Sequence, residues 1–243
     1  MDKFCEWVNH AKYTATNVVF DIGITTKYAI KRYQEENLEP TKCGGTKISE
    51  NGNGSLMRMF PIALYSYYKT LNDEEIYSIV KNTSSLTHAH EISILGCYIY
   101  VKYILNILNS STKEESYQLI KEINYEKYFT IDTINEYKRI LKNNIKDLTL
   151  DEINSSGYVR TTLESVLWTI SNTSNYKDAI IKSINLGEDT DTIGAITGSI
   201  AGIIYGYNSI PEKWLNKLKK LDYLESISTQ FDNILKSSEI FPK

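Results

Sequence analysis

The chain has 243 residues, a formal net charge of −3 and 23% charged residues. This length can bury a substantial core, and we expect one domain over residues 1–243. Lys and Arg are interspersed with Asp and Glu, which argues against a basic surface for nucleic acid or anionic membranes. We therefore expect small-molecule or protein partners, with no nucleic acid and no membrane.

The three cysteines, Cys5, Cys43 and Cys97, are odd in number and far apart. This spacing suits reduced thiols better than a disulfide framework, and it does not match a metal-site pattern. The N-terminus lacks the pattern of a signal peptide, and no apolar run reaches the ~20 residues of a membrane span. We therefore expect a cytoplasmic protein.

Helix-period patterns dominate and no alternating strand segments occur, which predicts an all-α fold. The helices expected in the first half of the chain are residues 2–9, 18–34, 59–68, 73–84 and 87–108. Thr87 is the expected N-cap of the last of these. Residues 110–154 are helical in pattern and rich in Lys and Glu, and we interpret them as scaffold with a solvated face.

A turn-rich stretch precedes the helix over residues 59–68. Gly52 and Gly54 let the backbone approach a ligand closely, and the following helix N-terminus offers free amides to phosphate. Asn53, Ser55 and Arg58 add hydrogen-bond donors. The alternative is a tight turn without a ligand, which Asn-Gly-Asn-Gly by itself also indicates.

Two histidines, His88 and His90, follow Thr87. Residues two apart on a helix do not share a face, which argues against a paired metal site. A capping histidine is the alternative to a ligand-binding role for His88.

The most informative stretch runs from Asn185 to Trp214. Asp189, Thr190, Asp191 and Thr192 place oxygen ligands at the positive end of a predicted helix. Hard divalent cations prefer such ligands. A simple N-cap is the alternative for Asp189 or Thr190, although four consecutive oxygen side chains exceed what one cap needs.

Glycines recur at every fourth residue of the helix that follows: Gly194, Gly198, Gly202 and Gly206. A glycine in a helix interior costs about 1 kcal/mol relative to alanine. The glycine ridge therefore predicts that another backbone packs tightly against it and that the helix is central and buried.

The segment Asn-Leu-Gly-Glu-Asp-Thr-Asp-Thr, with its glycine-spaced continuation, resembles the C-terminal signature of the ADP-ribosylglycohydrolase family. The resemblance implies an orthogonal multi-helix bundle that uses two Mg²⁺ ions. It also implies a hydrolase that removes ADP-ribose from a modified protein side chain or a related ADP-ribosyl substrate. The family pattern assigns Asp189, Asp191 and Thr192 to magnesium, with Asp189 and Asp191 as catalytic residues.

The resemblance also implies a substrate site, because residues 52–58 match the family's ADP-ribose loop and Ser-Gly-Tyr-Val matches its pocket helix. The implied substrate-binding residues are Gly52, Asn53, Gly54, Ser55, Met57, Arg58, His88, Gly157 and Tyr158. We expect the loop to face Asp189 across one cleft. Residues 21–26 resemble a family segment upstream of this loop, but Ile24 replaces the expected Asn and removes a polar group from the cleft.

Family members usually begin with a Gly-Asp-x-x-Gly helix and a Thr-Asp-Asp-Thr motif, which contributes about half of the magnesium ligands. Neither motif occurs in this sequence, so we expect an N-terminally truncated domain with a single or weakly bound Mg²⁺. Three hypotheses remain open: an active glycohydrolase, an ADP-ribose-binding paralogue impaired in catalysis, and a structural remnant. The fold alone cannot separate them.

Overall fold

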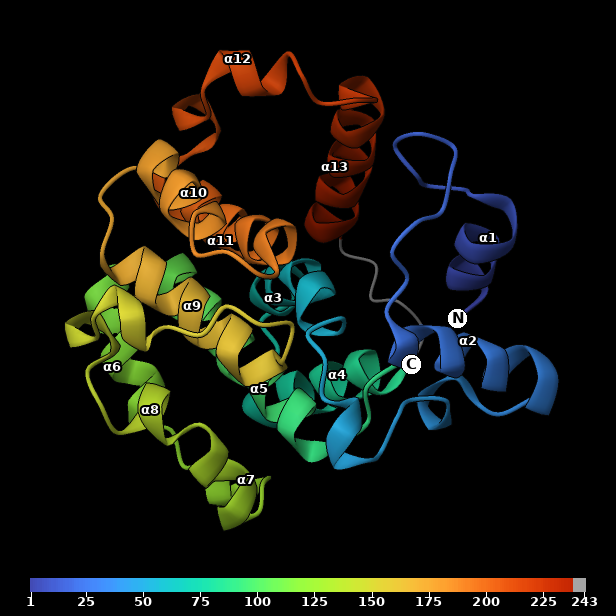
Figure 1. The fold of residues 1–243 in the computed structure, drawn as a ribbon, viewed down its shortest axis with the longest axis horizontal. Coiled ribbons are helices and arrows are strands. Elements are labelled where there is room, and N and C mark those ends of the chain that lie inside the picture. The colour runs from blue at the N-terminus through green and yellow to red at the C-terminus, as the bar shows by residue number, and fades with distance from the viewer. Residues whose placement is uncertain (238–243) are drawn as a thin grey trace.

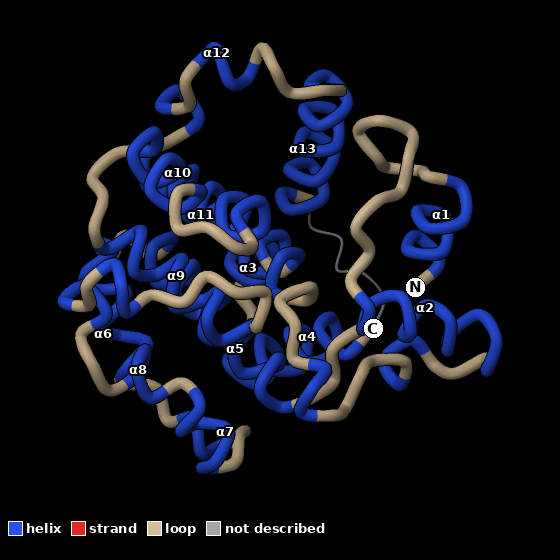
Figure 2. The backbone as a smooth tube through the Cα atoms, in the orientation of Figure 1, coloured by secondary structure: helices blue, strands red, loops and turns tan. Residues whose placement is uncertain are grey.

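The chain folds into helices, and the computed structural model describes residues 1–237. Within this range short turns join thirteen α-helices, with two isolated β-bridges and no strand (Figure 2). The helices are α1 Asp2–His10, α2 Ile24–Glu36, α3 Phe60–Tyr68, α4 Asp73–Ser85, α5 Glu91–Leu108, α6 Lys113–Lys121, α7 Ile131–Glu136, α8 Lys138–Leu141, α9 Val159–Ser171, α10 Tyr176–Ile184, α11 Thr190–Tyr205, α12 Glu212–Leu215 and α13 Leu221–Lys236. The all-α prediction is confirmed.

Helix α5 forms the centre of the core. It is apolar on nearly all sides, and thirteen of its 18 residues are buried. Helices α3, α4, α6, α9 and α11 pack around it, as expected for a helix without a polar face. Among the described residues, α5 alone is long and apolar enough to cross a membrane, and 72% of its apolar window is buried inside the fold.

Two helix starts differ from the prediction. Helix α2 begins at Ile24, not at residue 18, because Asp21 has a φ of 49° and Gly23 takes the N-cap position. Helix α5 begins at Glu91, and its N-cap is His90, not Thr87. The Thr87 hydroxyl is instead engaged by the side chains of Arg58 and His88.

The first two helices and the last described helix lie at one side of the molecule. In Figure 1, α1, α2 and the segment between them stand beside α13, while α7 and α8 lie at the opposite edge. Lys220, just before α13, donates from Nζ to the Thr14 carbonyl at 2.7 Å and to Asn17 Oδ1 at 2.9 Å. These contacts fix the segment that leads into α2.

The glycine ridge of α11 is only half covered. A Cβ at Gly194 would lie 2.9 Å from a side-chain atom of α10, and one at Gly198 would lie 3.3 Å from another. A Cβ at Gly202 would meet nothing within 4 Å, and Gly206 has a φ of 80° and ends the helix. Side chains of α10 cover the first two glycines, and nothing lies within 4 Å of a Cβ at either of the last two. The prediction that another backbone packs tightly against the ridge is therefore wrong, and the central helix of the fold is α5.

This difference gives a stability test within one helix. Gly198→Leu should lower the melting temperature relative to Gly202→Leu, since overpacking a close contact costs about 1 to 3 kcal/mol. Both variants gain the same helix propensity, so the comparison isolates packing. Thermal denaturation followed by circular dichroism measures the difference. Equal midpoints would contradict the close packing of α10 on α11.

Candidate functional site

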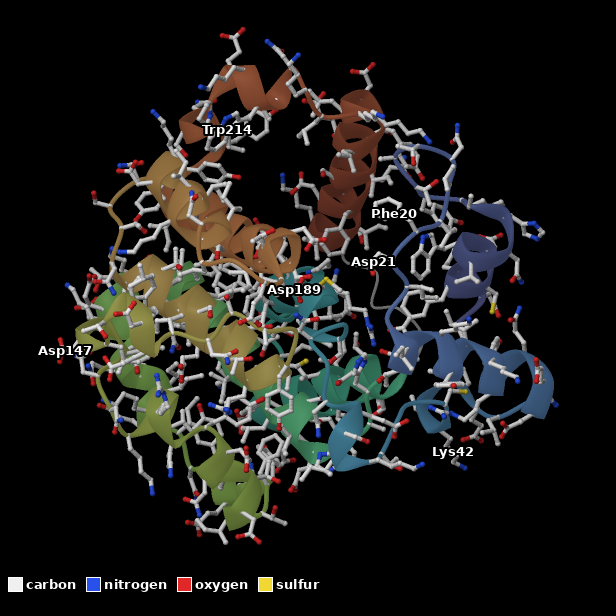
Figure 3. All side chains as sticks on the ribbon, in the orientation of Figure 1. Phe20, Asp21, Lys42, Asp147, Asp189 and Trp214 are labelled. Carbon is white, nitrogen blue, oxygen red and sulfur yellow. The ribbon has the colours of Figure 1, made fainter. Side chains whose placement is uncertain are left out.

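A cleft of about 520 Å³ opens where three distant parts of the chain meet: the start of α2, the loop that begins at Gly52, and the start of α11. Asp21 and Asp189, labelled in Figure 3, reach this region from opposite ends of the chain. The lining residues are Asp21, Gly23, Ile24, Thr25, Thr26, Gly52, Asn53, Gly54, Met57, His88, Gly157, Glu188, Asp189 and Thr192.

Backbone hydrogen bonds hold the Gly52 loop against the segment that precedes α9. The Asn53 amide donates to the Gly157 carbonyl at 3.0 Å, and Gly52 pairs with Tyr158 in an antiparallel bridge. The Asp189 amide donates to the Ser155 carbonyl at 3.2 Å. The segment before α9 therefore fixes both the loop and the start of α11.

One side chain joins the two halves of the cleft. Asn53 Nδ2 donates to Asp189 Oδ2 at 2.6 Å and to Thr162 Oγ1 at 2.9 Å. An amide nitrogen carries two hydrogens, so both donors of Asn53 are used. The loop and Asp189 thus share one cleft, as expected from the sequence. Asn53 orients the carboxylate of Asp189 instead of keeping a free donor for a ligand.

Oxygen ligands gather at the start of α11. Asp189 is the N-cap residue but makes no side-chain capping hydrogen bond, so its carboxylate is directed to Asn53. Thr192 and Glu188 line the same cleft, while the side chain of Asp191 is exposed and is not among the lining residues. No group of three or more His, Cys, Asp or Glu side chains within residues 1–237 could hold a metal ion.

The side chains in the cleft supply only part of a magnesium coordination shell. Mg²⁺ requires near-octahedral oxygen coordination, and it usually combines one or two carboxylates with water and substrate oxygens. Asp189 and Thr192 supply two oxygen-bearing side chains to the cleft, with Glu188 exposed at its edge. The described residues thus provide part of a cation site, which water and substrate oxygens would complete.

Arg58 lies beneath the loop and is not among the cleft-lining residues. Its Nη1 donates to the Gly54 carbonyl at 3.0 Å, and its Nη2 donates to the Thr83 carbonyl at 2.9 Å and to Thr87 Oγ1 at 2.7 Å. Its guanidinium also lies 5.3 Å from the centroid of the Phe4 ring. Burial lowers the pKa of Arg58 to about 10. The side chain ties the loop to the end of α4.

Two other predicted substrate residues lie outside the cleft lining. Ser55 is buried, and its Oγ lies 3.3 Å from Cys97 Sγ of α5. Tyr158 is partly buried and lies beside Arg160, whose guanidinium is 5.8 Å from the ring centroid. The predicted residues that the structure does bring together are Gly52, Asn53, Gly54, Met57, His88, Gly157, Asp189 and Thr192.

Residues at the start of α2 line the cleft, although the predicted site did not include them. They are Asp21, Gly23, Thr25 and Thr26, and Glu188 joins them from the other side. The signal for the first four is the Asp-Ile-Gly-x-Thr-Thr pattern, which resembles the family segment upstream of the Gly52 loop. Ile24 also lines the cleft and is 74% exposed, so an apolar side chain does stand where a polar one was expected.

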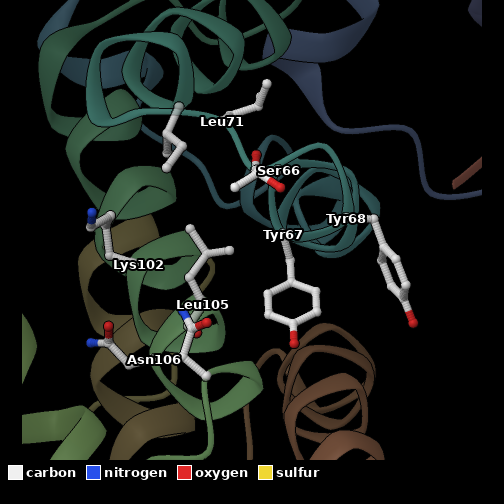
Figure 4. Close-up of a pocket in the computed structure, with 10 residues that line it drawn as sticks. Ser66, Tyr67, Tyr68, Leu71, Lys102, Leu105 and Asn106 are labelled. Carbon is white, nitrogen blue, oxygen red and sulfur yellow. The ribbon is translucent and has the colours of Figure 1, made fainter. Parts of the chain in front are cut away.

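A second hollow of about 500 Å³ lies between the end of α3 and the side of α5 (Figure 4). Several of its polar side chains already have partners inside the protein. Lys102 pairs with Asp73 at 3.0 Å, and Ser66 Oγ donates to the Ile62 carbonyl at 2.8 Å. This hollow lacks the glycines and carboxylates of the first cleft, which is therefore the candidate site.

Comparisons with known proteins identify the family of the chain. The model of the ADP-ribosylglycohydrolase family matches residues 1–239. The ADP-ribosylarginine hydrolase Tri1 of Serratia proteamaculans is 32% identical over 236 residues, which is 94% of this chain and 59% of that relative. The ADP-ribosyl-[dinitrogen reductase] glycohydrolase of Rhodospirillum rubrum is 26% identical over 82% of this chain and 60% of its own length.

A solved structure described as an ADP-ribosylglycohydrolase-related protein complex has the same fold. It aligns with a TM-score of 0.76 at 22% identity, over 96% of this chain and 72% of that chain. The chain spans about three fifths of the length of the curated relatives that it matches. The match of the family model over nearly the whole sequence shows that the chain belongs to the ADP-ribosylglycohydrolase family.

Proposed function

We propose that the protein binds ADP-ribosyl groups in the cleft and removes ADP-ribose from a modified substrate. The observation that carries this proposal is the hydrogen bond between Asn53 and Asp189, which joins the glycine loop to the acidic start of α11. A diphosphate is recognised by backbone amides, and ribose hydroxyls are recognised by carboxylate oxygens. The cleft offers both kinds of hydrogen-bonding group to one ligand.

The two loop glycines let His88 pack directly against the loop. A Cβ at Gly54 would lie 2.9 Å from His88 Cε1 and 3.3 Å from Thr26 Oγ1, and a Cβ at Gly52 would lie 3.5 Å from His88 Nε2. A side chain at Gly54 would therefore displace His88, and one at Gly52 would crowd it. The glycines thus hold the loop backbone and His88 together in one wall of the cleft.

Arginine-linked ADP-ribose is the first substrate class to test. The Serratia relative is described as an ADP-ribosylarginine hydrolase, and it matches nearly the whole of this chain. We propose the same bond type here, with the modified protein as the partner. Release of ADP-ribose from an ADP-ribosylated arginine peptide, followed by chromatography, is the direct assay of turnover.

Magnesium dependence belongs to the same proposal. Asp189 and Thr192 would contribute oxygens to the ion, which when bound supplies positive charge near the ribose hydroxyls. The remaining ligands are not present as an acidic cluster among the described residues. Turnover measured with and without added Mg²⁺ tests this dependence.

A second function, ADP-ribose binding without hydrolysis, is favoured by that small donor set. It shares the loop, His88 and Asp189 with the first proposal and differs only in turnover. Binding of ADP-ribose without release from the modified peptide, even at high Mg²⁺, would select this second function. Absence of both binding and release would contradict both proposals.

A further inference from the structure

Three side chains form a hydrogen-bonded line from beneath the Gly52 loop to the cleft. Arg58 Nη2 donates to Thr87 Oγ1 at 2.7 Å, and Thr87 Oγ1 lies 2.7 Å from His88 Nδ1. Thr87 is fully buried and His88 is 2% exposed. The line ends at the far side of the imidazole ring, where His88 lines the cleft.

The direction of these hydrogen bonds fixes the positions of the protons. A guanidinium nitrogen can only donate, so the Thr87 oxygen accepts from Arg58. Within residues 1–237 the Thr87 hydroxyl has no partner besides Arg58 and His88. Its own hydrogen must therefore go to His88 Nδ1, because a buried hydroxyl hydrogen without an acceptor is unfavourable.

We infer that Arg58 and Thr87 hold His88 as a neutral imidazole with its hydrogen on Nε2, so that His88 presents a hydrogen-bond donor to the cleft. The ring nitrogen that accepts from Thr87 cannot carry a hydrogen, which assigns the tautomer. Nε2 lies 3.5 Å from the Cβ position of Gly52 and from that of Gly54. The donor therefore lies against the backbone of the Gly52 loop, in the wall of the cleft.

The surroundings of His88 keep the ring neutral. Burial lowers the pKa of His88, and the positive charge of Arg58 lowers it further, to about 3. The imidazole is therefore uncharged throughout the physiological pH range and is not available as a general acid. The other ionisable groups on the surrounding elements are Asp21, Glu188 and Asp189 in the cleft and His90 before α5.

This inference deepens the proposed function and, for the ligand, rests on it. A donor at Nε2 recognises an acceptor oxygen of ADP-ribose, on the diphosphate or on a ribose. Because the donor is neutral, its hydrogen bond does not change between pH 5 and pH 8. Arg58 is then a positioning residue that acts through Thr87 without touching the ligand.

Imidazole nitrogen chemical shifts test the tautomer without any ligand. The chain has only three histidines, so long-range ¹H–¹⁵N correlation spectra of labelled protein can be assigned by mutation. His88 should show the Nε2–H form, unchanged from pH 5 to pH 8. In Thr87→Val, which keeps the side-chain shape but removes the hydroxyl, no hydrogen bond selects one ring nitrogen, so the two tautomers should mix.

Two matched variants control this experiment. Thr87→Ser keeps the hydroxyl and should keep the wild-type signature. Thr169→Val makes the same isosteric change at another fully buried threonine, whose hydroxyl has no partner among the described residues. It should leave the His88 signals unchanged. An Nδ1–H tautomer in the wild-type protein, or titration near pH 6, would overturn the inference.

Calorimetry with ADP-ribose tests whether His88 donates a hydrogen bond to the ligand. Thr87→Val should weaken binding about 3- to 10-fold, the effect of one disturbed hydrogen bond. Unchanged affinity in this variant would overturn the donor role of His88. A wild-type protein with the Nε2–H signature but no ADP-ribose binding would instead contradict the proposed function and leave the tautomer assignment standing.

Discussion

Replacing Asp189 with alanine should reduce release of ADP-ribose by a factor on the order of 10² to 10³, the loss typical of removing one electrostatic contact at a reacting centre. Asp189 lines the cleft together with Asp21 and Glu188, and its carboxylate is the one that Asn53 orients, at 2.6 Å. ADP-ribose binding should be retained in part, because the loop at Gly52 and Gly54 is unchanged. Turnover and calorimetry on the same preparation separate the two effects.

Two other carboxylates serve as comparisons for this variant. Asp222→Ala removes an exposed carboxylate from the first turn of α13 and should leave both binding and turnover unchanged. Asp191→Ala tests the family resemblance, which expects loss of hydrolysis with part of the binding retained, although this side chain is exposed. Full turnover in Asp189→Ala would show that the start of α11 is not part of the active site.

Changing Asn53 to aspartate should have the second large effect. The substitution keeps the side-chain shape but places a carboxylate where an amide donates to Asp189 Oδ2, inside a nearly buried position. Two lost hydrogen bonds that leave buried partners cost about 1 to 3 kcal/mol each, and the repulsion of the two carboxylates adds to this. The variant should melt well below the parent at pH 7.

The loss of stability in Asn53→Asp should depend on pH. Repulsion raises the pKa of one carboxyl group of the pair above its unfolded value of about 3.9. The folded state then binds more protons than the unfolded state, so stability is greatest at low pH and is lost as pH rises through the raised pKa. The deficit relative to the parent should therefore be smaller at pH 5 than at pH 7.5.

Asn53→Ala provides the matched control. It removes the same hydrogen bonds without adding a charge, so its deficit should be nearly independent of pH in this range. It should also weaken ADP-ribose binding, because Asp189 loses its orienting partner. Equal pH profiles for Asn53→Asp and Asn53→Ala would show that the side chain at position 53 does not face the Asp189 carboxylate.

The sequence predicted those parts of the fold that depend on local pattern. Helices α1, α3 and α4 lie within one or two residues of their expected ranges, because their apolar periodicity and end signals are local. The expected N-cap at Thr87 was wrong because a distant residue, Arg58, engages its hydroxyl. No local pattern in the sequence reveals that contact.

The same limit applies to the cleft. Glycine spacing and consecutive acidic residues indicated Gly52, Gly54 and Asp189, since these signals lie within short segments. The actual position of Arg58 depends on burial beneath the loop, and the contribution of Asp21 depends on a left-handed turn before α2. Both are consequences of tertiary packing. For the same reason the spacing of the α11 glycines could not show that α10 covers only two of them.

Calorimetry of the full chain with ADP-ribose, with and without Mg²⁺, tests the central claim most directly. We expect saturable heat of binding to a single site. The affinity for ADP-ribose should be weaker in Asn53→Ala and unchanged in Asp222→Ala. No heat at millimolar ADP-ribose, in a preparation that still shows a cooperative melting transition, would contradict it.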